Sequence, residues 1–213
     1  MADTYFTREI DFSKGDVIIH QSYIGDVGHV VWDAAIVLAK FLDGKYFTSN
    51  ETLTLQGKSV VELGSGTGLV GLVAAMNGAS VRITDLNELV PLMEKNIEAN
   101  QHLLQGNAKA ESLKWGVDLE MKMKADIILI ADCIYYDESL EPLVNTMHSL
   151  CHETTVIYMS YEERNTDLKI ELEKKFFKLL DGLFSTERIS RDLQDPLYNS
   201  DDIHILKISL LKR

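Results

Sequence analysis

The sequence contains little cysteine and proline and has no excess of basic side chains. Only 2 of the 213 residues are cysteines, Cys133 and Cys151, and no C-x-x-C pair occurs. We therefore expect neither a disulfide framework nor a structural zinc site, which favours a reducing, cytoplasmic compartment. The 33 acidic residues outnumber the 21 Lys and Arg, giving a net charge of -12, and this argues against general nucleic-acid binding. With 46% hydrophobic residues and 3 prolines, disordered and collagen-like classes are excluded.

Long apolar runs and linkers are missing as well. The longest mostly apolar run, 125–136, is interrupted by Asp126 and Asp132 and is far shorter than the ~20 residues that span a bilayer. The first 14 residues lack the apolar core of a secretion signal. We expect no membrane association and a monomer. No repeat or linker divides the chain, so residues 1–213 should form a single domain, with residues 1–27 as an N-terminal hairpin appendage.

Apolar runs and helical patterns alternate along most of the chain. Strands are expected at 58–63, 80–85, 109–115, 125–133 and 154–160, and helices at 33–41, 67–77, 88–101, 139–150 and 165–181. This alternation predicts an α/β fold with a mostly parallel, Rossmann-like sheet. Two late strands, 184–190 and 202–210, are joined too closely for a parallel crossover and should form an antiparallel edge. Residues 5–12 and 17–23 flank a short turn and predict the N-terminal β-hairpin.

A glycine-rich loop follows the first predicted strand of the sheet and opens a helix. It reads Gly64-Ser65-Gly66-Thr67-Gly68, a pattern that brings backbone N–H groups against a ligand. A dinucleotide fingerprint needs glycine where Leu69 stands, which disfavours NAD. Glu62 at the loop entrance would repel a pyrophosphate and attract a ligand's amino group. Asp85 ends the next strand, where a carboxylate can accept both ribose hydroxyls; the alternatives are a plain tight turn and a helix cap.

The acid followed by G-x-G-x-G resembles the first motif of the class I, seven-strand methyltransferases that use S-adenosylmethionine and release S-adenosylhomocysteine. The two late strands match the antiparallel edge of that fold. More narrowly, four segments look like the protein lysine methyltransferases with a D-x-x-Y motif: 30–35, 114–116, 131–136 and 202–204. Within this group, residues 137–143 and 161–164 are similar to the enzyme that methylates the valosin-containing protein. The resemblance thus implies a hexameric AAA ATPase of this type as partner.

The resemblance also implies roles for individual residues in the cofactor site. Glu62, Gly64, Ser65 and Gly66 would contact the methionine part of the cofactor, and Asp85 its ribose. Trp115 and Ala131 would border the adenosine, and Trp32 would close over the cofactor. For Trp115 the sequence gives independent support, because this ring follows a predicted strand and falls at the carboxyl edge, where open α/β sheets bind ligands. Packing in the core is the alternative for both tryptophans.

Asp132 ends another predicted strand, beside the same crevice. A lysine with a pKa near 10.4 is neutral in only about one molecule in a thousand at neutral pH, yet only the neutral amine can attack a methyl group. A carboxylate favours the ammonium, so we expect Asp132 to recruit and orient the amine while burial and the cofactor's positive charge favour its deprotonation. In the D-x-x-Y motif, Tyr135 would act with Asp132, and Tyr136 and Tyr161 would wall a channel for the lysine stem. Pairing of Asp132 with a nearby cation and ordinary aromatic packing are the alternatives.

Several other functions remain possible from the sequence. The six histidines show no metal-ligand spacing, so we expect no metal, and no serine-nucleophile motif occurs. The prediction is a protein-lysine N-methyltransferase acting on a valosin-containing-type ATPase. The alternatives are a methyltransferase with another acceptor, such as a different chaperone lysine, a histidine or a small amine, and a cofactor-binding pseudoenzyme. An NAD oxidoreductase ranks last.

Overall fold

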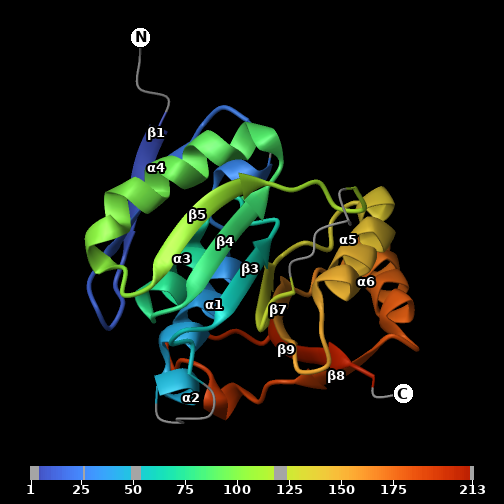
Figure 1. Cartoon of the computed structure of the whole chain (residues 1–213). Coiled ribbons are helices and arrows are strands. Elements are labelled where there is room, and N and C mark those ends of the chain that lie inside the picture. Colours follow the sequence, from blue (N-terminus) through green and yellow to red (C-terminus); the bar gives the residue numbers. More distant parts are fainter. Residues whose placement is uncertain (1–4, 26, 49–53, 118–123, 212–213) are drawn as a thin grey trace.

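The computed structural model describes residues 5–25, 27–48, 54–117 and 124–211 and contains two β-sheets (Figure 1). The strands are β1 (Tyr5–Ile10), β2 (Val17–Ser22), β3 (Ser59–Leu63), β4 (Ser80–Asp85), β5 (Asn107–Ser112), β6 (Ile127–Ala131), β7 (Val156–Glu162), β8 (Phe184–Arg188) and β9 (Ile203–Leu210). The α-helices are α1 (Asp33–Asp43), α2 (Lys45–Thr48), α3 (Leu69–Met76), α4 (Val90–Asn100), α5 (Asp137–Leu150) and α6 (Asp167–Leu180). Short 3-10 turns are η1 (Val27–His29), η3 (Asn87–Leu89), η4 (Gln101–Leu103) and η5 (Arg191–Leu193).

The main sheet has seven strands in the order β5-β4-β3-β6-β7-β9-β8. The strands from β5 to β7 pair in parallel, whereas β9 runs antiparallel to both β7 and β8. This strand order confirms the predicted Rossmann-like, mostly parallel fold. The antiparallel strand, β9, lies next to the edge strand β8 and not at the edge itself. The strand order reverses between β3 and β6, and open sheets bind their ligands at such a switch point, outside the carboxyl ends of the strands.

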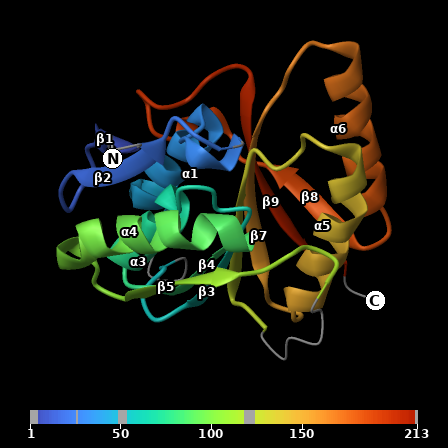
Figure 2. The same cartoon turned by 90° about the horizontal axis from the view of Figure 1, so that it is seen from above.

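Two helical layers bury the sheet, each against its own apolar core. Side chains of α1 and α3 dominate one core, which also takes Met93 of α4, while α5 and α6 fill the other. Figure 2 shows α5 and α6 on one side of the sheet and the N-terminal hairpin with α4 on the other. The central strands are apolar on both faces because both faces are covered, as the continuous apolar runs indicated.

The N-terminal hairpin is docked onto α4 by two buried asparagines one helical turn apart. Asn100 accepts a hydrogen bond from the backbone N–H of Ile18 at 2.8 Å and donates to the Ile18 carbonyl at 2.7 Å. Asn96 makes the same pair of bonds to His20, at 2.7 and 3.1 Å. The two amides thus act as a partner strand for β2, which fixes the hairpin beside the glycine loop.

Several observed boundaries differ from the predicted ones by a few residues. The third parallel strand was expected at 109–115 but spans Asn107–Ser112, so Trp115 lies in the loop after it. Helix α3 starts at Leu69 rather than Thr67, because Gly66 and Gly68 hold the preceding turn in left-handed conformations. None of the helices in the described ranges could span a membrane.

Candidate functional site

One cavity of about 470 Å³ opens at the carboxyl ends of the central strands. This volume falls within the range of small-molecule and cofactor sites. Its lining brings together eleven of the twelve residues singled out in the sequence, namely Trp32, Glu62, Gly64, Ser65, Gly66, Asp85, Trp115, Ala131, Asp132, Tyr135 and Tyr136. The cavity has two ends of different character, which we call the cofactor half (β3, the glycine loop and the end of β4) and the acceptor half (residues 132–136 and the β7–α6 connection).

The glycine loop of the cofactor half has a backbone that only glycine adopts easily. Gly64 and Gly66 have φ values of 63° and 55°, in the left-handed region. A Cβ on Gly64 would lie 2.7 Å from both the Cys133 sulfur and the Trp115 ring, and one on Gly66 would lie 2.9 Å from the Gly28 carbonyl oxygen. These glycines therefore let two segments close on the loop and keep its backbone exposed to a ligand.

Glu62 lies at the base of this loop and is almost completely buried, with 2% of the residue exposed. Its carboxylate accepts a hydrogen bond from the Gly71 backbone N–H at 3.1 Å, and a Cβ on Gly71 would lie 2.5 Å from the same oxygen. Burial raises the pKa of Glu62 to about 8, because the apolar surroundings disfavour the charged form. A cationic group of a ligand would supply the missing counter-charge.

Asp85 faces the loop from the tip of β4. Its two oxygens accept hydrogen bonds from the backbone N–H groups of Gly66 and Leu86, each at 2.7 Å. A carboxylate offers about four lone-pair positions, so each oxygen keeps capacity to accept a ligand hydroxyl. Burial raises the pKa of Asp85 above its usual value, while the two backbone bonds oppose this shift. The arrangement fits recognition of a ribose diol.

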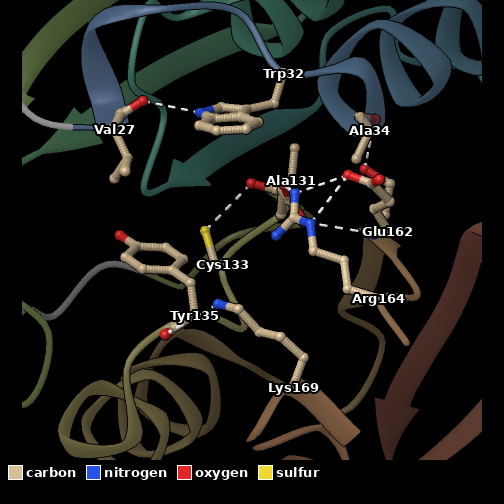
Figure 3. A network of polar contacts seen from close by, with 11 residues as sticks. Val27, Trp32, Ala34, Ala131, Cys133, Tyr135, Glu162, Arg164 and Lys169 are labelled. Atoms are coloured by element: carbon tan, nitrogen blue, oxygen red, sulfur yellow. Dashed lines mark hydrogen bonds and ion pairs between the residues drawn. The ribbon is translucent and has the colours of Figure 1, made fainter. Parts of the chain in front are cut away.

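Aromatic and small side chains line the remaining walls of the cofactor half. Trp115 is half-buried, its ring lies close to Gly64, and Ala131 ends β6 and lines the same cavity. Trp32 precedes α1, is 41% exposed, and donates an indole N–H bond to the Val27 carbonyl at 2.8 Å (Figure 3). The carboxylates of Glu62 and Asp85, the glycine loop and these rings together fit a cofactor that carries an amino group, a ribose and a flat base.

In the acceptor half, Asp132 directly follows β6 and is held in an unusual backbone conformation. Its φ is 54°, it is the one non-glycine residue with positive φ in the described part of the chain, and its backbone N–H donates to the Ser160 carbonyl at 2.9 Å. The carboxylate is 8% exposed and forms an ion pair with Arg164, whose Nη2 lies 2.6 Å from Oδ2. The alternative in which Asp132 pairs with a nearby cation is therefore realised in this structure.

Two tyrosines and a lysine complete the acceptor half. The rings of Tyr135 and Tyr136 meet edge to face, with centroids 4.7 Å apart, and Tyr136 is 45% exposed. Lys169, in the first turn of α6, donates to the Tyr135 carbonyl at 3.2 Å (Figure 3). Burial, followed by the charge of Arg164, lowers the pKa of Lys169.

Tyr161 is the one predicted channel residue that the structure does not bring to the cavity. It is 7% exposed, packs edge-on against Phe177 and His204, and donates its hydroxyl proton to Glu173 at 3.2 Å. The prediction assumed that Tyr161 ends its strand. Alternation along β7 puts Tyr161 on the same face as Ile157 and Met159, which pack in the core with α5 and α6, away from the cavity.

The sequence interpretation missed Arg164 and Lys169 as parts of the site and Gly71 as a support for Glu62. A weak signal existed for Arg164, since it follows a strand at the ligand-binding edge. Gly71 is a glycine inside an otherwise apolar helix, which also signals a close approach. Among the described residues, no three His, Cys, Asp or Glu side chains gather as metal ligands.

Comparison with solved structures supports the fold. The chain superimposes on the Thermus thermophilus 16S rRNA N2 G1207 methyltransferase, solved with AdoMet and guanosine, with a TM-score of 0.66 and 18% identity over 98% of this chain and 51% of that one. The magnesium protoporphyrin IX methyltransferase of Synechocystis, solved with SAH, gives a TM-score of 0.56 and 18% identity, over 88% and 90%. At this identity the likeness concerns the fold.

Sequence comparison is more specific. A family profile described as lysine methyltransferase matches residues 12–182. Protein N-lysine methyltransferase METTL21A of Mus musculus is 36% identical over 85% of this chain and 77% of the relative. Protein-lysine methyltransferase METTL21E of Bos taurus is 39% identical over 76% and 55%. The fold, the cavity and these matches agree, and the chain therefore belongs to the lysine methyltransferase family as an S-adenosylmethionine-dependent protein-lysine N-methyltransferase.

Proposed function

We propose that this enzyme methylates the ε-amine of a lysine in a hexameric AAA ATPase of the valosin-containing type. The single observation that carries the acceptor chemistry is the buried carboxylate of Asp132, which binds a cationic N–H donor inside the cavity. A lysine ammonium offers the same charge and the same kind of donor.

In this proposal the cofactor half binds S-adenosylmethionine through residues that already face the cavity. Glu62 would bind the amino group, the loop of Gly64, Ser65 and Gly66 would lie along the methionine part, and Asp85 would bind the ribose. Trp115 and Ala131 would border the adenosine, and Trp32 would cover the cofactor. When bound, S-adenosylmethionine supplies a methyl group activated by a positively charged sulfur.

The acceptor half would then position the amine. Asp132 binds the incoming ammonium and orients it, while Tyr135 and Tyr136 flank the aliphatic stem. Their ring faces also attract a methylated ammonium, which favours repeated methylation of one lysine. Asp132 is no base for the reaction, since a carboxylate stabilises the charged amine. The proton leaves to water when the desolvated amine lies in line with the methyl group, and such placement contributes much of the rate.

The choice of the ATPase rests on two segments that resemble an enzyme acting on the valosin-containing protein, residues 137–143 and 161–164. Residues of both segments line the cavity, Glu138, Ser139 and Pro142 from the first and Arg164 from the second. The segments that carry the narrower resemblance thus line the same cavity as Asp132. This proximity supports the proposed target.

We further propose that the enzyme works as a monomer in the cytoplasm, as one domain. The docked N-terminal hairpin supports the single domain, because Ile10, Phe12, Val17 and Ile19 belong to the same apolar core as α1 and α3. Both cysteines are buried free thiols, which is consistent with a reducing compartment.

The test uses the full-length protein, methyl-labelled S-adenosylmethionine and cell lysate, followed by mass spectrometry of labelled peptides. The Asp132→Ala variant removes the proposed amine-binding carboxylate, and Asp181→Ala, at the exposed end of α6, is the matched control. Cofactor binding by each protein is measured by calorimetry. We expect label on one lysine of the ATPase with the wild type and the control, and none with Asp132→Ala, which still binds the cofactor.

Other outcomes would change specific parts of the proposal. Label on a lysine of another protein would contradict the target and retain the role of Asp132. Label on histidine or on a small amine would contradict the acceptor class. Full activity of Asp132→Ala would remove that carboxylate from the mechanism.

A further inference from the structure

The cation that pairs with Asp132 comes from the enzyme itself. Arg164 lies just after β7, two residues beyond Glu162, and its guanidinium reaches into the cavity between Trp32 and Lys169 (Figure 3). The carboxylate of Asp132 is 8% exposed, and its charged form is costly in such poorly hydrated surroundings unless a cation pairs with it. Arg164 offsets this cost by donating one N–H bond at 2.6 Å, beside a longer bond of 3.4 Å from the backbone N–H of Glu162.

Arg164 holds Glu162 through more contacts than it holds Asp132. Both Nε and Nη2 donate to one Glu162 carboxylate oxygen, at 3.2 and 2.7 Å, whereas Asp132 receives Nη2 alone. The guanidinium carbon also lies 5.5 Å from the centre of the Trp32 ring, within cation-π range. Because Glu162 and Trp32 remain as partners, Arg164 can leave Asp132 and still be neutralised and packed.

We propose that Arg164 is a specificity-determining residue that fills the amine-binding position of Asp132 until the acceptor lysine displaces it onto Glu162. This inference rests on the proposed function of Asp132 as the amine-binding carboxylate. The exchange keeps charge in balance, since one cation leaves Asp132 as another arrives and Arg164 retains a carboxylate partner.

The exchange selects among acceptors. A lysine that brings only its ammonium gains the same kind of ion pair that it breaks, so its net gain at Asp132 is small. A target that also contacts the surface around the cavity gains additional binding energy and can displace Arg164. The apparent affinity for any acceptor is lowered by the fraction of enzyme in which Asp132 is occupied.

The test is steady-state kinetics with the acceptor protein identified in the labelling experiment. Arg164→Met removes the internal cation and keeps an aliphatic side chain of similar length. If Asp132 is free in about one tenth of the wild-type molecules, the KM for the acceptor should fall about tenfold in this variant, with kcat little changed. Lys175→Met is the matched control, because Lys175 of α6 is exposed, pairs with Asp137 at the start of α5, and does not line the cavity; its KM should equal that of the wild type. Arg164→Lys restores a cation and should return the KM toward the wild-type value.

A small cation tests whether Arg164 occupies the amine-binding position or only supports the structure around it. In Arg164→Met, added methylguanidine should compete with the acceptor, because it can occupy Asp132 as the lost side chain did. A higher KM or a tenfold lower kcat in Arg164→Met, with rescue by methylguanidine, would overturn the inference and make Arg164 a supporting residue. Thermal unfolding and cofactor binding verify that the variant is folded.

The two proposals fail in distinguishable ways. If the wild type labels no lysine, or if Asp132→Ala keeps its activity, the proposed function fails. If lysine labelling depends on Asp132 but Arg164→Met has an unchanged or higher KM, only the inference about Arg164 fails.

Discussion

The two halves of the cavity are built from different kinds of contact. In the cofactor half, backbone groups make the decisive bonds: the N–H groups of Gly66 and Leu86 hold Asp85, and that of Gly71 holds Glu62. In the acceptor half, the short bond to Asp132 comes from a side chain, that of Arg164, 32 residues away in the sequence, while the backbone N–H of Glu162 lies farther off, at 3.4 Å. Backbone donors are fixed by the sheet and the helix, whereas a long side chain can change partners.

This difference shows how one site combines a constant task with a selective one. A cofactor is the same molecule in every turnover, so a preformed cradle of backbone donors suits it. The acceptor is a side chain of another protein that must be distinguished from many lysines, and an exchangeable ion pair can impose that selection. Four substitutions would test the contrast, from the largest expected effect to the smallest.

Gly66→Ala should disable the cofactor half. The added Cβ would lie 2.9 Å from the Gly28 carbonyl oxygen, so one of the two segments must shift, and a displacement of about 1 Å can lower a rate about 100-fold. Calorimetry with S-adenosylmethionine should show weakened binding in parallel. Gly182→Ala is the control, because its φ of 78° carries the same backbone strain while nothing lies within 4 Å of the added carbon. Equal losses in both variants would contradict the rigid cradle.

Glu62→Gln should weaken cofactor binding about 10- to 100-fold, the effect of losing a hydrogen bond to a charged group. It should also remove a pH dependence. With a pKa of about 8, Glu62 is mostly protonated at neutral pH and must ionise to bind an ammonium, so wild-type affinity should rise with pH up to about 8. Cofactor-binding titrations at several pH values check this. If the affinity of Glu62→Gln rises with pH as steeply as that of the wild type, the pH dependence belongs to another group.

The same raised pKa affects stability in the opposite direction. Between the ordinary pKa of 4.5 and about 8, the folded, cofactor-free protein binds more protons at Glu62 than the unfolded chain does. Its unfolding free energy should therefore decrease as pH rises through this window. In Glu62→Gln this contribution should be absent from denaturation curves.

Trp32→Ala should have a moderate effect on both halves, because its ring lies over Arg164 and also lines the cofactor end. Losing a cation-π contact at a partly exposed site corresponds to about two- to fivefold in affinity. Binding titrations with the cofactor and KM measurements with the acceptor would reveal this change. Trp32→Phe should keep most of the cofactor affinity and a KM close to that of the wild type. An effect on one half alone would mean that this ring does not couple them.

Tyr161→Phe should leave kcat and KM unchanged, since the hydroxyl points away from the cavity toward Glu173. The loss of that hydrogen bond should lower the unfolding free energy by about 1 kcal/mol, measured by chemical denaturation. A changed KM for the acceptor would return Tyr161 to the channel.

The sequence was most informative where neighbours in the chain are also neighbours in the site. The glycine loop, Glu62 and Asp85 sit at strand ends whose apolar patterns are clear, so the parallel sheet and the cofactor half followed from them. The face to which a strand residue points was less certain: Tyr161 shares the face of Ile157 and Met159 and packs in the core, although it lies at the ligand-binding end of β7.

Side-chain pairings between distant elements could not be predicted. The bonds of Asn96 and Asn100 to β2 depend on how the hairpin docks, and asparagine in a helix gives no sign of its partner. The Arg164 pairing likewise depends on the path of the β7–α6 connection. Such contacts arise from tertiary packing, for which periodicity carries no signal.

The left-handed backbone at Asp132 limits how this enzyme family member can change its chemistry over evolutionary time. Aspartate and asparagine tolerate positive φ better than other non-glycine residues, so Asp-to-Asn replacement is the substitution at this position that conserves both backbone and shape. It exchanges a charged acceptor for a neutral amide, suited to uncharged nitrogen groups. Replacement of Asp132 by asparagine is thus a step toward a new acceptor class that adds little backbone strain. Most other residues at position 132 would strain the left-handed turn.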